Sequence, residues 1–287
     1  MNDRPFPQDP PLGRIEFDYV RGLVRRESAI VLDDSKTYLV ASRLLPVARR
    51  NGFATVGALI SHLQNSSQGP LHTEVVEAIA TTETSFFRDL HPFTALRDEI
   101  LPELIAKRGS TSRTLSIWSA ACSSGQEPHS IAMILHDRFP SLATWNLQLL
   151  ASDLSSRMVA RAREGMYSQL EVNRGLPAPY LVRFFEQKED SWYLRPEIRS
   201  MFRYFQMNIA QQWASVSPVD VLLLRNVLIY FDVAERQAVL SRVRRVLRPD
   251  GYLVLGSAET TLNLDHLFTR VRIGNAVFYQ LAKGTHG

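Results

Sequence analysis

Near its middle the chain reads Ser116-Ile-Trp-Ser-Ala-Ala-Cys-Ser-Ser-Gly-Gln-Glu-Pro-His-Ser-Ile-Ala-Met-Ile-Leu135, and the rest of the molecule can be worked out from this run. A β-rich segment, 114–119, passes through a loop of small residues into an apolar helical pattern whose first turn contains Pro128. A strand, a tight loop and a helix in this order hold nucleotide-like ligands in doubly wound α/β domains. The run therefore predicts a Rossmann-like α/β domain, although a purely structural strand-to-helix connection would show the same pattern.

The loop within this run is poor in the glycines that phosphate binding requires. Gly125 is the only glycine between Ser116 and Leu135, whereas a dinucleotide site uses the pattern G-x-G-x-x-G. Glu127 also brings a carboxylate to the place where a phosphate would lie. The loop argues against NAD and favours a phosphate-free, cationic adenosine ligand, for which S-adenosylmethionine is our candidate.

Composition limits the number of domains and the kinds of partner that the protein can have. The 287 residues suit one large or two ordinary domains, and the net charge of +4 favours acidic partners. No aromatic-and-basic pattern indicates nucleic acid, no apolar run is long enough to span a membrane, and no metal site is expected. A single cysteine, Cys122, excludes an intramolecular disulfide and reads as a small buried filler. The polar start of the chain does not resemble a signal peptide, so we expect a cytoplasmic monomer without direct membrane insertion.

The pattern along the chain predicts the domain organisation. Residues 1–13 are rich in proline and read as a disordered leader. Residues 14–90 show helical periodicity and predict an all-α N-terminal domain for substrate recognition. Residues 91–287 predict the α/β domain, with a small antiparallel β-subdomain inserted at about 166–201 and a C-terminal hairpin.

Two features of the N-terminal region point to substrate binding. Lys36, Arg43 and Arg50 are seven residues apart and so share one helix face, which predicts a docking surface for an acidic helix. Solvation of an exposed basic face is the alternative. The segment 81–89, Thr-Thr-Glu-Thr-Ser-Phe-Phe-Arg-Asp, places hydroxyls around two phenylalanines and predicts a flap over a pocket. Helix capping with core packing would explain it equally well.

Polar residues follow three other predicted strands. Asp153 ends the second strand and is placed to bind ribose hydroxyls, unless it is only an acid in the cap region of the next helix, which Ser155 can cap. Asn208 ends the strand at 201–207, where its amide could read adenine or simply form a turn. Arg225 and Asn226 follow the buried strand 219–224 and are expected to face the ligand crevice.

These motifs together resemble the chemotaxis receptor methyltransferase family, CheR. The resemblance extends from about Phe17 to the C-terminus and rests on five segments, 81–89, 118–128, 151–154, 225–231 and 248–253. It implies an all-α domain followed by a class I S-adenosylmethionine methyltransferase domain. The reaction would be protein-glutamate O-methylation on cytoplasmic helices of chemoreceptors, which tunes chemosensory adaptation and leaves S-adenosyl-L-homocysteine.

Carried over by position, the family's cofactor contacts fall on nine residues: Thr82, Thr84, Arg88, Glu127, Asp153, Asn208, Ile209, Arg225 and Asn226. Two positions depart from the pattern, because Thr82 stands where some relatives have asparagine and Gln126 replaces a more usual acid. Since the accepting carboxylate is already ionised at neutral pH, no general base is needed. We expect Arg88 to bridge cofactor and substrate, and Tyr230 to orient the incoming carboxylate unless it is a core residue.

The short, glycine-free loop 187–191 in the β-subdomain predicts a family member that does not depend on a receptor C-terminal pentapeptide. Two other functions remain open. One is a non-catalytic adaptor that uses bound cofactor as a signal. The other is methylation of a receptor in a surface-sensing or biofilm pathway.

Overall fold

The computed structural model describes residues 12–213 and 216–282. Most of the predicted leader, residues 1–11, lies outside the described residues. The chain forms two compact units: one ends at Thr81 and includes Tyr230–Asp232, and the other comprises Thr82–Ile229 and the chain from Val233. The residue limits that the sequence predicts for the domains remain predictions. Among the described residues, no helix has the length and apolar character needed to cross a bilayer.

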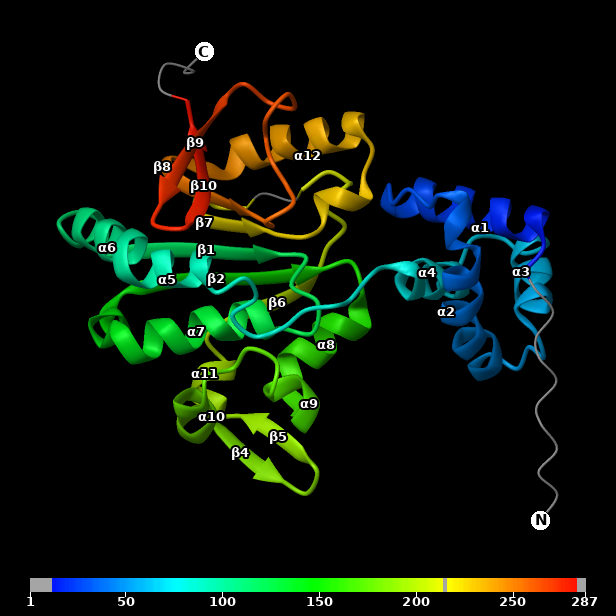
Figure 1. Ribbon diagram of the computed structural model, residues 1–287, viewed down its shortest axis with the longest axis horizontal. Coiled ribbons are helices and arrows are strands. Elements are labelled where there is room, and N and C mark those ends of the chain that lie inside the picture. Colours follow the sequence, from blue (N-terminus) through cyan, green and yellow to red (C-terminus); the bar gives the residue numbers. More distant parts are fainter. Residues whose placement is uncertain (1–11, 214–215, 283–287) are drawn as a thin grey trace. The chain divides into compact units, whose positions relative to one another are not determined.

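The first unit is a helical cluster, as the sequence predicts (Figure 1). Its elements are α1 (Arg14–Ser28), η1 (Asp34–Lys36), α2 (Thr37–Arg50), α3 (Val56–Gln64) and α4 (Pro70–Ile79). The helices pack through apolar stripes, of which Val20, Val40 and Ile60 are fully buried members. The α4 helix begins at Pro70, because proline is well suited to the first helical turn.

The second unit is built on a seven-stranded sheet with the order β6-β2-β1-β7-β8-β10-β9. The strands are β1 (Thr114–Ala120), β2 (Asn146–Asp153), β6 (Arg203–Gln206), β7 (Val219–Leu224), β8 (Leu247–Leu255), β9 (Phe268–Ile273) and β10 (Ala276–Leu281). The first five in the sheet order are parallel, and β10 and β9 complete it as an antiparallel hairpin. The predicted α/β class with a terminal hairpin is confirmed.

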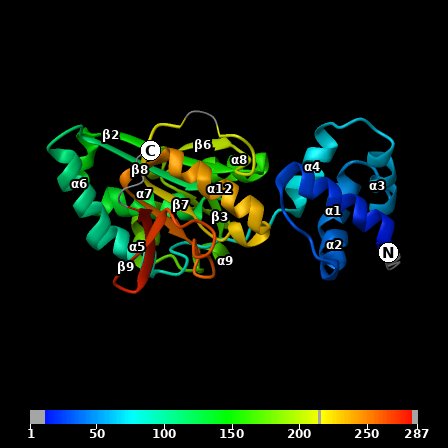
Figure 2. The same ribbon diagram turned by 90° about the horizontal axis from the view of Figure 1, so that it is seen from above.

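Helices cover both faces of this sheet. The helical elements are α5 (His91–Ala95), the π-helical η2 (Leu96–Ile100), α6 (Leu101–Gly109), α7 (Gln126–Arg138), η3 (Pro140–Thr144), α8 (Ser156–Glu164), η4 (Leu228–Tyr230) and α12 (Val233–Val246). Figures 1 and 2 show α12 on the face opposite to α7 and α8. This arrangement explains why β7 is buried along its whole length.

A second, three-stranded antiparallel sheet follows α8. It has the order β3-β5-β4, with β3 (Met166–Ser168), β4 (Phe185–Lys188) and β5 (Ser191–Leu194), and α9 (Gln169–Val172), α10 (Ala178–Phe184) and α11 (Pro196–Arg199) surround it. The chain then returns to the main sheet as β6, next to β2.

One sequence prediction for the main sheet was wrong. The run Arg-Pro-Asp-Gly at 248–251 predicts a turn before a strand that begins at Tyr252, because proline and glycine favour turns, but β8 already begins at Leu247. Val219 pairs with Leu247 and Val221 with Tyr252, so the intervening residues form a bulge inside the strand. The bulge brings Arg248 to within 3.3 Å of Asp220, which is fully buried.

Candidate functional site

The carboxyl ends of β1, β2 and β7 lie side by side in the sheet, because β1 pairs with both β2 and β7. The strand order changes direction between β1 and β7, since β2 and β6 continue to one side and β7 and β8 to the other. Open α/β sheets bind their ligands in the crevice at such a point. The loops that follow these three strands are therefore the candidate site.

The loop after β1 adopts a strained backbone that holds it close to α8. Ala121, Ser123 and Gly125 all have positive φ angles, of 62°, 50° and 96°. A Cβ atom on Gly125 would lie 2.8 Å from the Cβ of Ala162, so only glycine fits here. The single glycine of the loop thus serves close packing against α8 and not the approach to a phosphate.

Asp153 fixes this loop from the end of β2. The backbone N–H of Ser123 donates to Asp153 Oδ2 at 2.8 Å, and the N–H of Ser155 donates to Oδ1 at 2.9 Å. Asp153 thus holds the β1 loop and also the backbone of Ser155, the residue whose side chain caps α8. Asp153 therefore lies in the cap region of α8, with Ser155 as the cap, and its carboxylate also lies at the candidate site. The N–H of Met207 donates to the backbone oxygen of Asp153, which brings the segment after β6 to the same place.

A chain of charges crosses the crevice from α7 to the segment before α5. Glu127 accepts from Ser119 Oγ at 2.7 Å and from Arg225 Nη1 at 2.9 Å. Arg225 Nη2 donates to Asp89 Oδ2 at 2.7 Å and to the backbone oxygen of Arg88 at 2.8 Å. The Arg225 side chain is only 2% exposed. A buried guanidinium is tolerated because two carboxylates compensate its charge, so Arg225, Asp89 and Glu127 form one charged cluster.

The segment 82–90 lies against the β1 loop and the N-terminal half of α7. Ser123 Oγ donates to the backbone oxygen of Thr82 at 2.6 Å, and the N–H of Phe87 donates to Ser130 Oγ at 3.0 Å. Phe86 is fully buried, with its ring centroid 4.9 Å from that of Tyr167. Arg88 Nη1 donates to the backbone oxygen of Glu83 at 3.1 Å. Core packing and contact with the β1 loop therefore occur together in this segment.

Sequence reasoning missed Glu259, which organises the loop after β7. This buried carboxylate accepts from the backbone N–H groups of Asn226, Val227 and Leu228 at 2.7, 2.8 and 2.7 Å, and from that of Gly256 at 2.6 Å. Asn226 has a φ of 58°. The signal in the sequence was an acid three residues after Gly256, at the end of a buried strand, but its partners lie about thirty residues away.

A second missed feature is a buried imidazole on α7. His129 is fully buried, with Nδ1 2.7 Å from the hydroxyl of Tyr167 and Nε2 2.6 Å from that of Tyr204. Tyr167 donates its proton to the backbone oxygen of Ser124 at 2.9 Å, so it must accept from Nδ1–H. Tyr204 then donates to Nε2. Burial, with a smaller contribution from the charge of Arg199, lowers the pKa of His129 from 6.5 to about 3, so the imidazole stays neutral.

The other predicted cofactor residues lie near Asp153 or in the segment before α5. Asn208 Oδ1 accepts from the N–H of Ala210 at 3.0 Å, which is the turn geometry that the sequence left open. Ile209 is buried and follows it. Thr84 is half-buried two residues after Thr82.

The predicted substrate-side residues belong to the helical unit. Arg43 Nη1 donates to the backbone oxygen of Ile79, and burial lowers the pKa of Arg43. Arg50 forms an ion pair with Glu74 at 2.6 Å, and Lys36 is half-buried. Tyr230 is assigned to this unit as well, and its backbone oxygen accepts from the N–H of Val31 at 2.9 Å. Arg43 and Arg50 thus already have partners within their own unit.

The chemistry of the crevice fits a cationic adenosine cofactor. Glu127 and Asp153 supply carboxylates at the ends of β1 and β2, which suit an ammonium group and ribose hydroxyls but repel phosphate. Burial raises the pKa of the Cys122 thiol, and the charges of Asp153 and Glu127 raise it further, so this thiol is not a nucleophile. Among the described residues, no group of three His, Cys, Asp or Glu side chains could hold a metal ion.

Comparison with known proteins agrees with this chemistry. Residues 82–277 match the family model for the CheR methyltransferase SAM binding domain, and residues 15–80 match that for the CheR methyltransferase all-alpha domain. S-adenosylmethionine, the predicted cofactor, is thereby confirmed.

Two curated relatives are similar over most of the chain. The chain is 36% identical over 273 residues to chemotaxis protein methyltransferase Cher2 of Pseudomonas putida, covering 93% of this chain and 98% of the relative. It is 37% identical over 270 residues to chemotaxis protein methyltransferase 1 of Pseudomonas aeruginosa, covering 92% and 97%. Among solved structures, a TehB-like SAM-dependent methyltransferase from Corynebacterium glutamicum is 12% identical with a TM-score of 0.37, covering 68% of this chain and 95% of that one.

Proposed function

Because the chain belongs to the CheR methyltransferase family, we propose that it methylates glutamate side chains in the cytoplasmic helices of chemoreceptors. S-adenosylmethionine-dependent methylation in chemotaxis is supported by the family and by the relatives' names. The finer assignment, to glutamate oxygen, follows the resemblance to the family. The observation that supports the proposal is the pair of carboxylates fixed by buried hydrogen bonds at the ends of β1 and β2, which suits a cationic methyl donor.

We assign the predicted cofactor residues to the crevice in two groups. Glu127 and Asp153 hold the cofactor's polar groups, and Asn208, Ile209 and Asn226 complete the surface around them. Arg225 acts through Glu127, because both of its Nη groups are engaged by protein oxygens. Thr82, Thr84 and Arg88 act from the segment before α5. When bound, the cofactor supplies an electrophilic methyl group on a sulfonium.

The protein's task in this reaction is to align the reacting groups. A glutamate carboxylate has an unperturbed pKa of about 4.3 and is ionised at neutral pH, so no residue has to remove a proton. Positioning and exclusion of water then account for the rate. Arg88 is our candidate for contact with the accepting carboxylate, and Tyr230 for its orientation. Lys36, Arg43 and Arg50 would attract the acidic receptor helix, although Arg50 already pairs with Glu74 and Arg43 donates to a backbone oxygen.

The test is methyl transfer from labelled S-adenosylmethionine to receptor cytoplasmic fragments from the same cell. A glutamate methyl ester is hydrolysed by mild alkali, whereas methyl groups on nitrogen are stable to it. We expect an alkali-labile label on receptor glutamates, reduced strongly by Arg88→Ala. An alkali-stable label would contradict glutamate methylation. Near-normal transfer by Arg88→Ala would remove Arg88 from the active site.

A further inference from the structure

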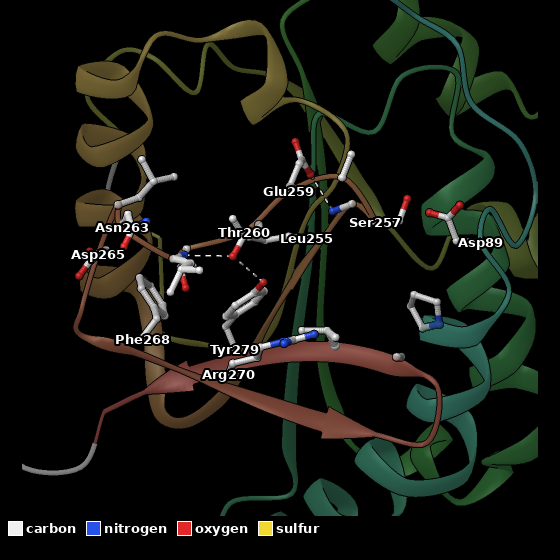
Figure 3. A pocket seen from close by; sticks show the side chains of 18 of the residues that line it. Asp89, Leu255, Ser257, Glu259, Thr260, Asn263, Asp265, Phe268, Arg270 and Tyr279 are labelled. Carbon is white, nitrogen blue, oxygen red and sulfur yellow. Dashed lines mark hydrogen bonds between the residues drawn. The ribbon is translucent and has the colours of Figure 1, made fainter.

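The two loops that border the candidate cofactor site are fixed in different ways. The loop after β7 is held by Glu259, which lies in the wall of a cavity of about 1130 Å³ at the carboxyl end of β8 (Figure 3). The loop after β1, residues 121–125, is held by Asp153 and by a tyrosine hydroxyl from the second, three-stranded sheet. This tyrosine joins the small sheet to the cofactor site.

The β1 loop needs such anchors because its backbone is strained. Ala121 and Ser123 have positive φ angles of 62° and 50°, in a region that residues other than glycine rarely adopt. This conformation is unfavourable and persists only where the surrounding structure holds it. Glu127 follows the loop in the first turn of α7, so a loop that relaxed would displace this carboxylate as well.

Tyr167, in the middle of β3, supplies the second anchor. Its hydroxyl is 2.9 Å from the backbone oxygen of Ser124 and 2.7 Å from Nδ1 of His129. A hydroxyl has one proton, so both contacts are hydrogen bonds only if Tyr167 donates to Ser124 and accepts from Nδ1–H. The imidazole is then the Nδ1–H tautomer. Its Nε2, at 2.6 Å from the hydroxyl of Tyr204, accepts from that hydroxyl.

Aromatic packing fixes the position of the Tyr167 hydroxyl. Tyr167 is 1% exposed, and its ring centroid lies 4.9 Å from that of Phe86 and 6.2 Å from that of Phe185. His129 is fully buried and also lies against the loop, because its Cε1 atom is 3.1 Å from the place that a Cβ atom on Gly125 would take. The hydroxyl and the imidazole therefore meet two successive residues of the loop from positions that are locked by packing.

We propose that Tyr167 is a positioning residue for the cofactor, which holds the β1 loop in its binding conformation through the backbone oxygen of Ser124. His129 acts through Tyr167, because its Nδ1–H leaves the tyrosine proton to Ser124. Within residues 12–213 and 216–282, the hydroxyl of Tyr204 bonds only to the imidazole. The inference rests on the part of the proposed function that places the cofactor at the β1 loop, and it is independent of the group that receives the methyl.

The two tyrosines form a matched pair for the test. Tyr167→Phe and Tyr204→Phe each remove one buried hydroxyl from the same imidazole and keep the ring, so both should lower stability. Tyr204→Phe leaves the Nδ1–H tautomer favoured, because only this tautomer keeps the bond from Tyr167 to Ser124. The affinity for S-adenosyl-L-homocysteine is measured by calorimetry at a temperature at which both variants are folded. This measurement needs no methyl acceptor.

We expect Tyr167→Phe to weaken cofactor binding by about tenfold. Its loop keeps the binding conformation in only a fraction of the molecules, and the apparent affinity falls in proportion to that fraction. Tyr204→Phe should bind the cofactor as the wild type does. With a receptor fragment as acceptor, Tyr167→Phe should raise the KM for S-adenosylmethionine and leave kcat at saturating cofactor nearly unchanged. A loss of stability alone would affect both variants alike.

The tautomer gives a second measurement that needs no variant of Tyr167. Nitrogen NMR of isotope-labelled histidine should show Nδ1 of His129 protonated and Nε2 unprotonated, with the signal assigned through His129→Gln. A protonated Nε2 would overturn the inference, because Tyr167 would then donate to Nδ1 and leave Ser124 without its hydrogen bond.

Equal affinity of Tyr167→Phe and the wild type would also overturn the inference, as would equal weakening by the two tyrosine variants. Asp153→Ala separates these outcomes from failure of the proposed cofactor site. If the cofactor lies at the β1 loop, Asp153→Ala binds it poorly whatever the tyrosine variants do. If Asp153→Ala binds it normally, the cofactor lies elsewhere, and the inference falls together with the proposed site.

Discussion

Mild acid should destabilise the second unit through one buried side chain, His129. Its pKa is lowered to about 3 in the folded protein from an ordinary value of 6.5, chiefly by burial. The unfolded chain therefore binds a proton at pH 5 that the folded chain does not bind. Folding stability is complete above pH 6.5, falls as the pH drops below 6.5, and levels off only near pH 3. Stability falls as the pH is lowered because the folded protein accommodates only the neutral imidazole.

The structure sets the size of the effect. Each pH unit between the two pKa values corresponds to about 1.4 kcal/mol, so the loss from pH 7 to pH 5 is about 2 kcal/mol from this group alone. The groups that face the imidazole are the hydroxyls of Tyr167 and Tyr204 and the more distant charge of Arg199. Neither tyrosine can ionise in this range, because burial raises the pKa of both. None of these neighbours offers an anion that would stabilise an imidazolium.

Urea unfolding at the two pH values, followed by tryptophan fluorescence, measures this loss. All four tryptophans, Trp118, Trp145, Trp192 and Trp213, lie in the second unit, so the signal reports on that unit. His129→Gln keeps a neutral polar group and removes the titration. Although this variant should be less stable at pH 7, its further loss at pH 5 should be about 2 kcal/mol smaller than that of the wild type. An equal loss in both proteins would refute the assignment of a neutral imidazole.

Four further predictions follow from the same contacts. Glu259→Gln should lower the free energy of unfolding by about 2–4 kcal/mol, measured in urea, because an amide cannot accept from all the N–H groups that now meet the carboxylate. Arg225→Ala should lower the free energy of unfolding by about 3–5 kcal/mol, since Asp89 and Glu127 would lose their buried cation. Calorimetry with a receptor C-terminal pentapeptide should show no micromolar binding, because only Glu189 and Asp190 join β4 to β5. Raising the salt concentration should reduce receptor methylation more than cofactor binding; equal sensitivity would contradict an electrostatic role of the basic helix face.

The parts of the site that the sequence predicted are those encoded within a few residues. The β1 loop, Asp153 and Arg225 each follow a run of buried residues, and the end of such a run marks the sheet's carboxyl edge. The order of these motifs then sufficed to identify the family. Glycine spacing also predicted correctly that the ligand is not a dinucleotide, because that argument depends only on local backbone conformation.

The parts that escaped prediction depend on contacts between distant residues. Glu259 meets the loop after β7 across about thirty residues, and nothing near Glu259 indicates which N–H groups it will accept from. His129 lies in an apolar helical pattern, where a histidine carries no local sign of its partners. Residues 248–251 form a bulge within β8 and not the expected turn. A short segment of this kind can interrupt a strand as well as connect a helix to a strand. The propensities of Pro249 and Gly251 do not distinguish these outcomes.

Two charged clusters, one centred on a residue within β7 and one on the residue directly after it, allow an effect on stability to be distinguished from an effect on ligand binding. Asp220, in β7, is fully buried and pairs with Arg108 at 2.8 Å and Arg248 at 3.3 Å, whereas Arg225 directly follows β7 and pairs with Asp89 and Glu127. Both clusters compensate a buried charge, so loss of either central residue should destabilise the unit by a similar amount. Only Arg225 touches residues of the crevice. If Arg225 positions Glu127 for the cofactor, Arg225→Ala must weaken cofactor binding under conditions in which the folded Asp220→Ala protein binds normally. If both variants lose the same affinity, the effect is one of stability, and Arg225 has no separate role in the site.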